Sequence, residues 1–450
     1  MAGGTWTSQN KKIPGVYINT VSKGTSAPSV GDKGVVAIAK SLNWGAPGVI
    51  QEYIPGQDTT PLIGYDITSN AALFLREMCK GSDVTNGPIK ILLYRFTGTG
   101  FVKASATVGA LTATAKYAGT RGNDITIVIA ANADDPTKYD IETVVDGAVV
   151  HTQTLDDLDN LVSNAWVDFS GTGTTITTTA GTALTGGVDG TFALSDYSDF
   201  LTALEPYTFD IVCNDIVDAS ITTALASFVE RVSENIGKKC QAVVAGATAL
   251  NSEWVINVNN GVKLADGTAL TNANATWWVA GAEAGARYNQ SLTYAQYPGA
   301  VAANPKKTND QVVAAVEAGD IVFIDDFDIV KICTDINTLT TYTPTKGQEF
   351  SKNRVMRVLN QICNDVYEHF SRFFIGKVDN NDSGRALMKG WIVGYLKEME
   401  ANNGIQNFEP DDVTVVQGNA IDSVIVNIAI MPVDSVEKIY CSITVSIIAA

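Results

Sequence analysis

The stretch IYCSITVSI, residues 439–447, alternates without a break between apolar and polar side chains. Ile439, Cys441, Ile443, Val445 and Ile447 are apolar, and the four residues between them are polar. This period of two predicts a β-strand that buries one face. Only three residues follow it. We therefore expect its partner strand to lie earlier in the chain or in another molecule.

The energetics of this strand are close to balanced if it stands alone. Burying four or five such side chains stabilises by about 6–12 kcal/mol, at roughly 1.5–3 kcal/mol each. Ordering nine residues costs about 1–2 kcal/mol per residue. The strand therefore needs a sheet, which is either that of its own domain or that of a neighbouring molecule.

Length and composition indicate a folded protein of several domains. The 450 residues are 45% hydrophobic and 18% charged, which is typical of globular chains. The net charge of −17 argues against nucleic-acid partners and anionic membranes. The sequence shows no secretory signal and no apolar run long enough to span a membrane, so we expect a cytosolic protein without membrane insertion.

The six cysteines lie far apart and form no CxxC motif. Each one sits in an apolar run. We therefore expect reduced core thiols, with neither a zinc site nor a disulfide framework.

Two separated segments, residues 31–97 and 191–340, carry the pattern of one α/β domain. Apolar runs at 35–39 and 89–96 predict buried strands on either side of a helix capped by Ser69. From Ser195 onward, helical and strand patterns alternate again. This order predicts parallel strands covered by helices.

Residues 98–190 differ in composition and predict an inserted all-β domain, a sandwich or barrel. Threonine, glycine and short alternating runs dominate, and Asp146-Gly147 marks a hairpin. We also predict strands at 166–169 and 174–179. The segment holds four basic and eleven acidic residues, so its surface is acidic.

Residues 341–436 predict a small α+β domain. Helical spacing runs from Val355 to a stop at Gly376, and a second helix spans 384–401. The strands expected at 413–416 and 421–431 form too little sheet for an independent domain. Residues 346–400 hold nine basic and seven acidic residues, a slightly positive stretch in an acidic chain.

No catalytic, cofactor-binding or metal-binding constellation is evident. The only two histidines, His151 and His369, lie outside the α/β domain, which excludes a nucleophile–histidine pair within it. The stretch GTGFVK at 98–103 lacks the third glycine of a dinucleotide loop. Residues 379–390 lack the closing carboxylate of a calcium loop. The acidic stretch 325–328 indicates a solvated hairpin tip.

Four stretches together resemble contractile tail sheath proteins, above all those of PBSX-like phages and phage-tail bacteriocins. They are IPGVYI at 13–18, AKYAGTRGNDITI at 115–127, LTGGVDG at 184–190 and CSITVSI at 441–447. The resemblance implies an outer β insert, a central domain similar to subtilisin in fold but without its triad, and an inner C-terminal domain that faces a tail tube. It further implies that arms 1–30 and 437–450 are donated to neighbouring subunits.

The function implied by this resemblance is mechanical. Stacked hexameric rings would surround a tail tube and contract on a signal from the baseplate, with a tail terminator as a further partner. Such a protein would be no enzyme, would need no cofactor, and would belong to the virion tail after assembly in the host cytoplasm. We expect two kinds of site residue. The subunit-linking arm residues are Val16, Tyr17, Ile18 and Asn19 with Ile439, Cys441, Ile443, Val445 and Ile447, and the tube-facing residues are Lys352, Arg354, Arg357 and Arg372.

Two other classes of protein remain open at this point. A hydrolase, inactive or unrecognised, would need a histidine brought to the α/β domain from another part of the chain. A self-assembling surface protein or adhesin would suit the threonine-rich insert, but it would need an export signal that the sequence does not show.

Overall fold

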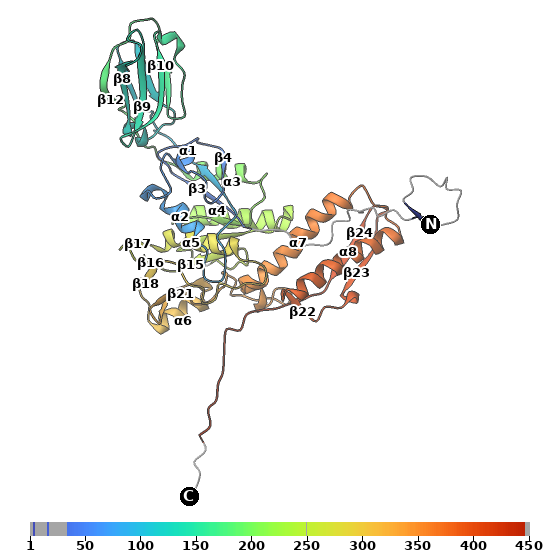
Figure 1. Ribbon diagram of the computed structural model, residues 1–450. Coiled ribbons are helices and arrows are strands. Elements are labelled where there is room, and N and C mark those ends of the chain that lie inside the picture. Colours follow the sequence, from blue (N-terminus) through green and yellow to red (C-terminus); the bar gives the residue numbers. More distant parts are fainter. Residues whose placement is uncertain (1–2, 5–15, 18–33, 249, 446–450) are drawn as a thin grey trace.

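The computed structural model of the chain describes residues 3–4, 16–17, 34–248 and 250–445 (Figure 1). A central α/β domain carries a β-sandwich at one end. A pair of long helices, α7 and α8, extends from its side. Beyond these helices the C-terminal chain leaves the body as an extended segment.

The central domain is organised around a seven-stranded sheet in the order β19-β15-β14-β13-β3-β5-β4. All neighbours run parallel except the edge strand β4, which is antiparallel to β5. The strands are β3 (Val35–Lys40), β4 (Ile50–Tyr53), β5 (Lys90–Arg95), β13 (Ile211–Cys213), β14 (Gln241–Ala245), β15 (Val255–Val258) and β19 (Asp320–Ile321). The continuous apolar runs at 35–39 and 89–96 therefore form adjacent, buried, parallel strands, as predicted.

Helices cover both faces of this sheet and enclose two apolar cores. One face packs against α2 and α5, and the other against α3 and α4. The small residues of α5 allow close packing, because a Cβ on Gly281 would lie 1.9 Å from the carbonyl oxygen of Met78. The helices of the domain are α1 (Thr60–Ile63), η1 (Asn70–Ala72), α2 (Leu73–Cys79), α3 (Leu194–Leu204), α4 (Ala219–Arg231), η4 (Val232–Ile236), α5 (Asn272–Gly285) and α6 (Asn309–Glu317).

Two small sheets extend the α2/α5 side of the domain. They comprise the three-stranded sheet β17-β16-β18 and the hairpin β20-β21. Their strands are β16 (Gly261–Leu264), β17 (Ala269–Leu270), β18 (Ala300–Asn304), β20 (Phe323–Asp326) and β21 (Ile329–Ile332). The hairpin confirms the turn predicted at 325–328. The strands at 255–304 have no counterpart in the sequence analysis, because runs of two to five residues carry little periodicity.

The insert is a sandwich of a four-stranded sheet, β10-β9-β8-β12, on a three-stranded sheet, β11-β7-β6. Its strands are β6 (Ser105–Val108), β7 (Leu111–Ala115), β8 (Ile125–Ala131), β9 (Tyr139–Val145), β10 (Ala148–Leu155), β11 (Val167–Ser170) and β12 (Thr179–Ala183), with short turns η2 (Thr120–Asp124) and η3 (Leu158–Asn160). The Asp146-Gly147 hairpin is confirmed. The strand predicted at 174–179 is wrong in position, because the pairing with β8 starts only at Thr179.

The sandwich is fixed to the central domain through the stretch 115–127. Arg121 is buried and donates from Nε to the carbonyl oxygen of Gly64, at 2.8 Å. Its guanidinium also pairs with Asp146 at 2.6 Å and stacks on Tyr65, with 4.1 Å to the ring centroid. Gly119 adopts φ 131°, and a Cβ there would lie 2.2 Å from the carbonyl oxygen of Asn43. This stretch therefore acts as a joint between two domains as well as a part of the sandwich.

The C-terminal region consists of two long helices with two small sheets. Its elements are η5 (Gln348–Ser351), α7 (Asn353–Phe373), α8 (Asp382–Ala401), β22 (Ile405–Gln406), η6 (Pro410–Asp412), β23 (Val413–Gln417), β24 (Val424–Ile428) and β25 (Met431–Pro432). The apolar faces of α7 and α8 enclose a separate core around Ile392, Tyr395 and Leu396. The strand predicted at 421–431 is split into β24 and β25, which pair with different partners.

Candidate assembly site

The described chain forms no strand from residue 433 to residue 445, a stretch that includes the described part, 437–445, of the C-terminal arm. Its last backbone hydrogen bond within the described residues runs from Val433 N to the carbonyl oxygen of Gly404, at 3.0 Å. The side chains of Ile439, Ile443 and Val445 are 83%, 87% and 81% exposed. Ile447 lies outside the described residues.

The strand predicted at 439–447 is therefore absent over its described part, 439–445. The physical reason is that, among the described residues, no strand pairs with the arm, so its backbone groups have no ladder partner there. Figure 1 shows the arm leaving the body as a single extended segment. An exposed apolar row on such a segment marks a candidate interaction surface.

The root of this arm is held by one carboxylate. Glu437 accepts a hydrogen bond from Thr293 Oγ1 at 2.8 Å and forms an ion pair with Lys352. Thr293 Oγ1 in turn accepts from the backbone N–H of Asp335 at 3.0 Å. From Lys438 to Val445 every described residue is exposed. Glu437 is thus the last anchored residue before the arm becomes free.

The N-terminal segment is described only at two short strands. β2 (Val16–Tyr17) pairs in parallel with β1 (Gly3–Gly4). The predicted linking residues Val16 and Tyr17 therefore form a short strand that pairs within this chain. The predicted linking residues Ile18 and Asn19 lie outside the described residues.

Within the described part of the chain, the sheets of the C-terminal region have unfilled edges. β23 pairs with β24 over five residues, from Val413 opposite Ile428 to Gln417 opposite Val424. β22 pairs with β25 over two residues. Val416 and Ile425 are 49% and 45% exposed. A two-stranded sheet leaves one edge of each strand without ladder hydrogen bonds, which suits the addition of a strand from outside.

The four basic residues predicted to face a tube lie in different environments. Arg372 is exposed, and its one ion pair among the described residues is with Glu368 one turn away, at 2.7 Å. Lys352 is engaged by Glu437. Arg354 is half-buried, and its guanidinium lies 3.4 Å from the carbonyl oxygen of Asn403. These three residues do not form one continuous basic surface on α7.

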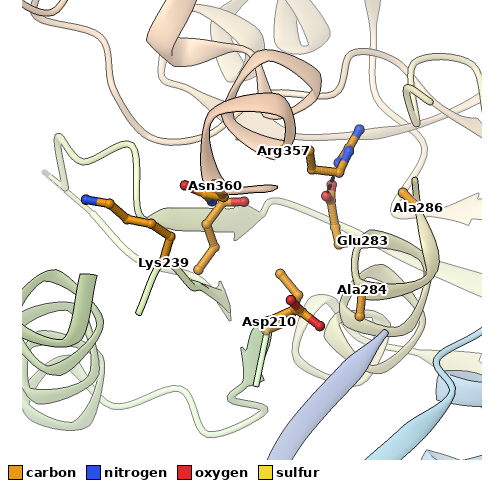
Figure 2. Close-up of a pocket in the computed structure, with 9 residues that line it drawn as sticks. Asp210, Lys239, Glu283, Ala284, Ala286, Arg357 and Asn360 are labelled. Atoms are coloured by element: carbon orange, nitrogen blue, oxygen red, sulfur yellow. Dashed lines mark hydrogen bonds and ion pairs between the residues drawn. The ribbon is translucent and has the colours of Figure 1, made fainter. Parts of the chain in front are cut away.

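Arg357 is placed in the interior, contrary to a tube-facing role. It pairs with Glu283 and with Asp335, the latter at 2.5 Å, and donates to the carbonyl oxygen of Gln290 at 2.8 Å. Figure 2 shows Arg357 on α7 pointing at Glu283 on α5. The guanidinium is used to join the C-terminal region to the central domain, so Arg357 is not carried into any proposed surface.

The charges in this buried cluster differ in protonation. Burial raises the pKa of Glu283, and the neighbouring Asp335 carboxylate raises it further. The pKa of Asp335 is lowered: burial opposes ionisation, but Arg357 and the hydrogen bond from Leu292 N outweigh it. Asn353 Nδ2 also donates to Asp335, at 2.9 Å. Arg357 and Asp335 thus form the ion pair of the cluster, and Glu283 favours its neutral form.

Sequence reasoning missed this cluster and the Glu437 anchor. One signal was available for Glu283, because it is the only charged residue in the stretch TWWVAGAEAGA at 276–286. An isolated carboxyl group among small and aromatic residues is buried only with a partner. No comparable signal marks Glu437 or Asp335, whose partners lie 85 and 22 residues away in sequence.

The histidines and cysteines show no reactive arrangement in the described part of the chain. His369 stacks on Trp391 with ring centroids 3.9 Å apart, and burial lowers its pKa. Burial raises the pKa of Cys240 to about 12, which leaves it a protonated core thiol. Cys363 and Cys441, however, are exposed, so the expectation of core thiols is wrong for them. Cys441 is exposed because its arm is.

Two further searches cover the described residues. No helix among them combines the length and apolar character needed to cross a bilayer. No group of three or more histidine, cysteine, aspartate or glutamate side chains among them could hold a metal ion.

We compared the chain with known protein families to identify the class of protein that has this domain order. The chain matches the phage tail sheath protein beta-sandwich domain over residues 99–189, the phage tail sheath protein central domain over 190–338, and the phage tail sheath C-terminal domain over 345–446. The chain belongs to the phage tail sheath protein family.

Particular relatives agree over almost the whole chain. The phage-like element PBSX protein XkdK of Bacillus subtilis is 32% identical, covering 99% of this chain and all of the relative. The crystal structure of a sheath tail protein from Desulfitobacterium hafniense is 43% identical, with a TM-score of 0.85 over 95% of this chain and 99% of that one. The helical sheath of the anti-feeding prophage in its contracted state shares the fold, with a TM-score of 0.57 at 13% identity over 96% of this chain and 99% of that one.

Proposed function

We propose that this chain is the structural subunit of a contractile tail sheath. It polymerises as stacked hexameric rings around a tail tube and contracts to drive the tube through a bacterial envelope. The observation that carries this proposal is the C-terminal arm, whose apolar side chains are exposed in the single chain. The fold shared with the contracted sheath of the anti-feeding prophage supports it.

Among the described residues, the arm lacks a sheet to join, and the sheets of the C-terminal region lack strands along their edges. The arm offers an alternating apolar face without a sheet. The pairs β23-β24 and β22-β25 offer open edges beside an apolar core. Adding the arm of one subunit to a sheet of its neighbour would bury about four apolar side chains, at roughly 1.5–3 kcal/mol each, and complete a row of backbone hydrogen bonds.

In this proposal the two arms are tethers that remain paired while the subunit bodies rotate. The N-terminal tether comprises Val16, Tyr17, Ile18 and Asn19. Because strand pairing can persist while bodies move about the linking segments, stored energy can be released as new lateral contacts without loss of the polymer. No step of this cycle requires catalysis by the chain.

The other proposed partners are the tail tube, the baseplate and the tail terminator. The particle would be a virion tail assembled in the host cytoplasm. Lys352, Arg354 and Arg372 remain candidates for contact with an acidic tube. If they act electrostatically, raising the salt concentration weakens binding of the tube, and an affinity unchanged by salt would refute their role.

The test of strand donation uses substitutions on the two faces of the arm. Ile443→Asp with Val445→Asp places charges on the apolar face, and Ser442→Asp with Thr444→Asp places the same charges on the polar face. All four residues are exposed in the single chain, so neither pair disturbs its folding. The readout is polymer formation, measured by sedimentation and by negative-stain electron microscopy.

We expect hollow cylinders from the wild type and from the polar-face variant, and monomers with unchanged thermal stability from the apolar-face variant. Cylinders from the apolar-face variant would refute donation of the arm. Unfolding of that variant would refute it as well, because it would place the arm in the core of its own subunit.

A further inference from the structure

The tip of the hairpin β20-β21 holds a large apolar residue in a strained backbone. Phe327 and Asp328 form the two-residue loop, with φ of 48° and 63°. Two positive φ angles in such a loop define a type I′ turn, which favours Asn-Gly and disfavours bulky residues. Phe327 is nevertheless 89% exposed, so it contributes almost no burial within its own chain. A strained and exposed aromatic residue points to a use outside the chain.

The charges around the tip are satisfied except for one. Asp326 pairs with Lys331 at 2.9 Å, and Asp325 pairs with Lys306 at 3.3 Å. Asp328 is exposed and has no ion-pair partner among the described residues. The hairpin therefore presents one apolar ring and one free carboxylate, side by side in sequence.

A surface groove of suitable character lies between α3 and α4. It encloses about 310 Å³. Its floor is formed by Leu201 and Phe228, both buried. Arg231 stands at its rim, where it pairs with Glu205 at 2.6 Å and keeps 44% of its side chain exposed. The remaining lining side chains are mostly small: Ser198, Thr202, Ala224, Ser227 and Glu205. Small walls over an apolar floor leave room for an aromatic ring, and the rim carries the partly exposed Arg231–Glu205 pair beside it.

The hairpin and the groove lie on opposite sides of the central sheet. Phe323, Val330 and Ile332 of the hairpin belong to the core on the α2/α5 face, whereas α3 and α4 pack on the other face. Figure 1 shows β21 and α6 on the side of the body away from α3. A ring and a groove on opposite sides of one chain cannot satisfy each other within it. Between copies they form a head-to-tail contact, which propagates or closes a ring.

We propose that Phe327 is an interface anchor that inserts into the α3–α4 groove of a second copy of this chain, where Asp328 approaches the exposed side of Arg231 and competes with Glu205 for its guanidinium. The inference rests on the proposed function in that it requires polymerisation. It adds a lateral contact that is independent of the arms. Such a contact explains why a residue that strains its own turn stands at this position.

The test replaces the tip by the turn that the backbone favours, Phe327→Asn with Asp328→Gly. Because this relieves the strain, we expect the thermal midpoint of the single chain to rise. Because it removes the anchor, we expect the concentration needed for polymerisation to rise by roughly 10- to 100-fold. Val313→Asn on α6, which removes a side chain that is 46% exposed, is the control and should change neither quantity.

A second variant tests the groove. Ser227→Trp fills it from an exposed position on α4. We expect the same rise in the polymerisation concentration, with little further rise when it is combined with the tip exchange, since both changes remove one contact.

The inference alone is overturned if both variants polymerise at the wild-type concentration while the apolar-face arm variant does not. Additive effects of the two changes would also overturn it, because the ring and the groove would then act at separate contacts. If the wild type forms no polymer at any concentration, both the inference and the proposed function are wrong.

Discussion

Replacing Arg357 by Gln tests the reasoning about the buried cluster that joins α7 to the central domain. The substitution removes three interactions of the guanidinium, namely the ion pair with Asp335, the contact with the Glu283 carboxyl group and the hydrogen bond to the carbonyl oxygen of Gln290. Removing one partner of a buried ion pair costs about 3–5 kcal/mol, because an uncompensated charge remains in the interior.

The expected loss of unfolding free energy can be narrowed from the contacts that remain after Arg357 is replaced. Asp335 keeps hydrogen bonds from Leu292 N and Asn353 Nδ2, each at 2.9 Å. Burial raises the pKa of Glu283, which weakens its tendency to carry a second buried charge. We therefore expect a loss of about 3 kcal/mol, at the low end of that range. The same change at Arg372, on the exposed side of α7, should cost at most about 0.5 kcal/mol, the value of an exposed pair one turn apart.

The assay is urea unfolding at neutral pH, followed by intrinsic fluorescence, with both variants compared with the wild type. Adding Asp335→Asn to Arg357→Gln should recover part of the lost stability, because the uncompensated carboxylate is then gone. Equal midpoints for the Arg357 and Arg372 variants would refute the interior ion pair, and so would a double variant less stable than the single one.

Two further predictions concern the same part of the molecule. The pKa of Glu283 is raised above its ordinary value of 4.5, so the folded chain binds the extra proton and wild-type stability falls as pH rises above about 4.5. Glu283→Gln should remove this fall, so its advantage in unfolding free energy over the wild type should grow with pH; a difference that is flat with pH would contradict it. Glu437→Gln should free the root of the arm, because it weakens the contacts with Lys352 and Thr293. We expect tryptic cleavage after Lys438 to become about tenfold faster, which corresponds to a loss of about 1.4 kcal/mol of anchoring free energy. Mass spectrometry of the released peptide measures this rate, and an unchanged rate would show that Glu437 holds nothing.

Much of the fold could be predicted because its elements carry strong local signals. The continuous apolar runs of β3 and β5, the Asp146-Gly147 turn and the long apolar stripe of α7 each reflect constraints that act within a few residues. The short strands β15 to β17 escaped detection because their burial comes from packing against α5 rather than from any pattern of their own, and β18 is held by β16 and the hairpin β20-β21.

The candidate assembly site divides in the same way. The alternation at 439–447 marked the arm as a strand in need of a sheet, because that pattern is written in adjacent residues. The neighbouring sequence did not indicate whether Arg357 is exposed or buried, since charge alone does not distinguish an exposed arginine from a buried one. Only the chain's packing of Glu283, Asp335 and Arg357 at one place decided it.

The sequence by itself determined the domain types, their order and the resemblance to tail sheath proteins, because period, composition and turn residues act over short distances. Only the tertiary structure decided that residues 439–445 have no partner strand among the described residues, and that Glu437 is the point at which they leave the body. It also showed that Phe327 stands exposed in a strained turn. These features depend on tertiary contacts between segments that are distant in sequence, and local sequence patterns do not specify such contacts.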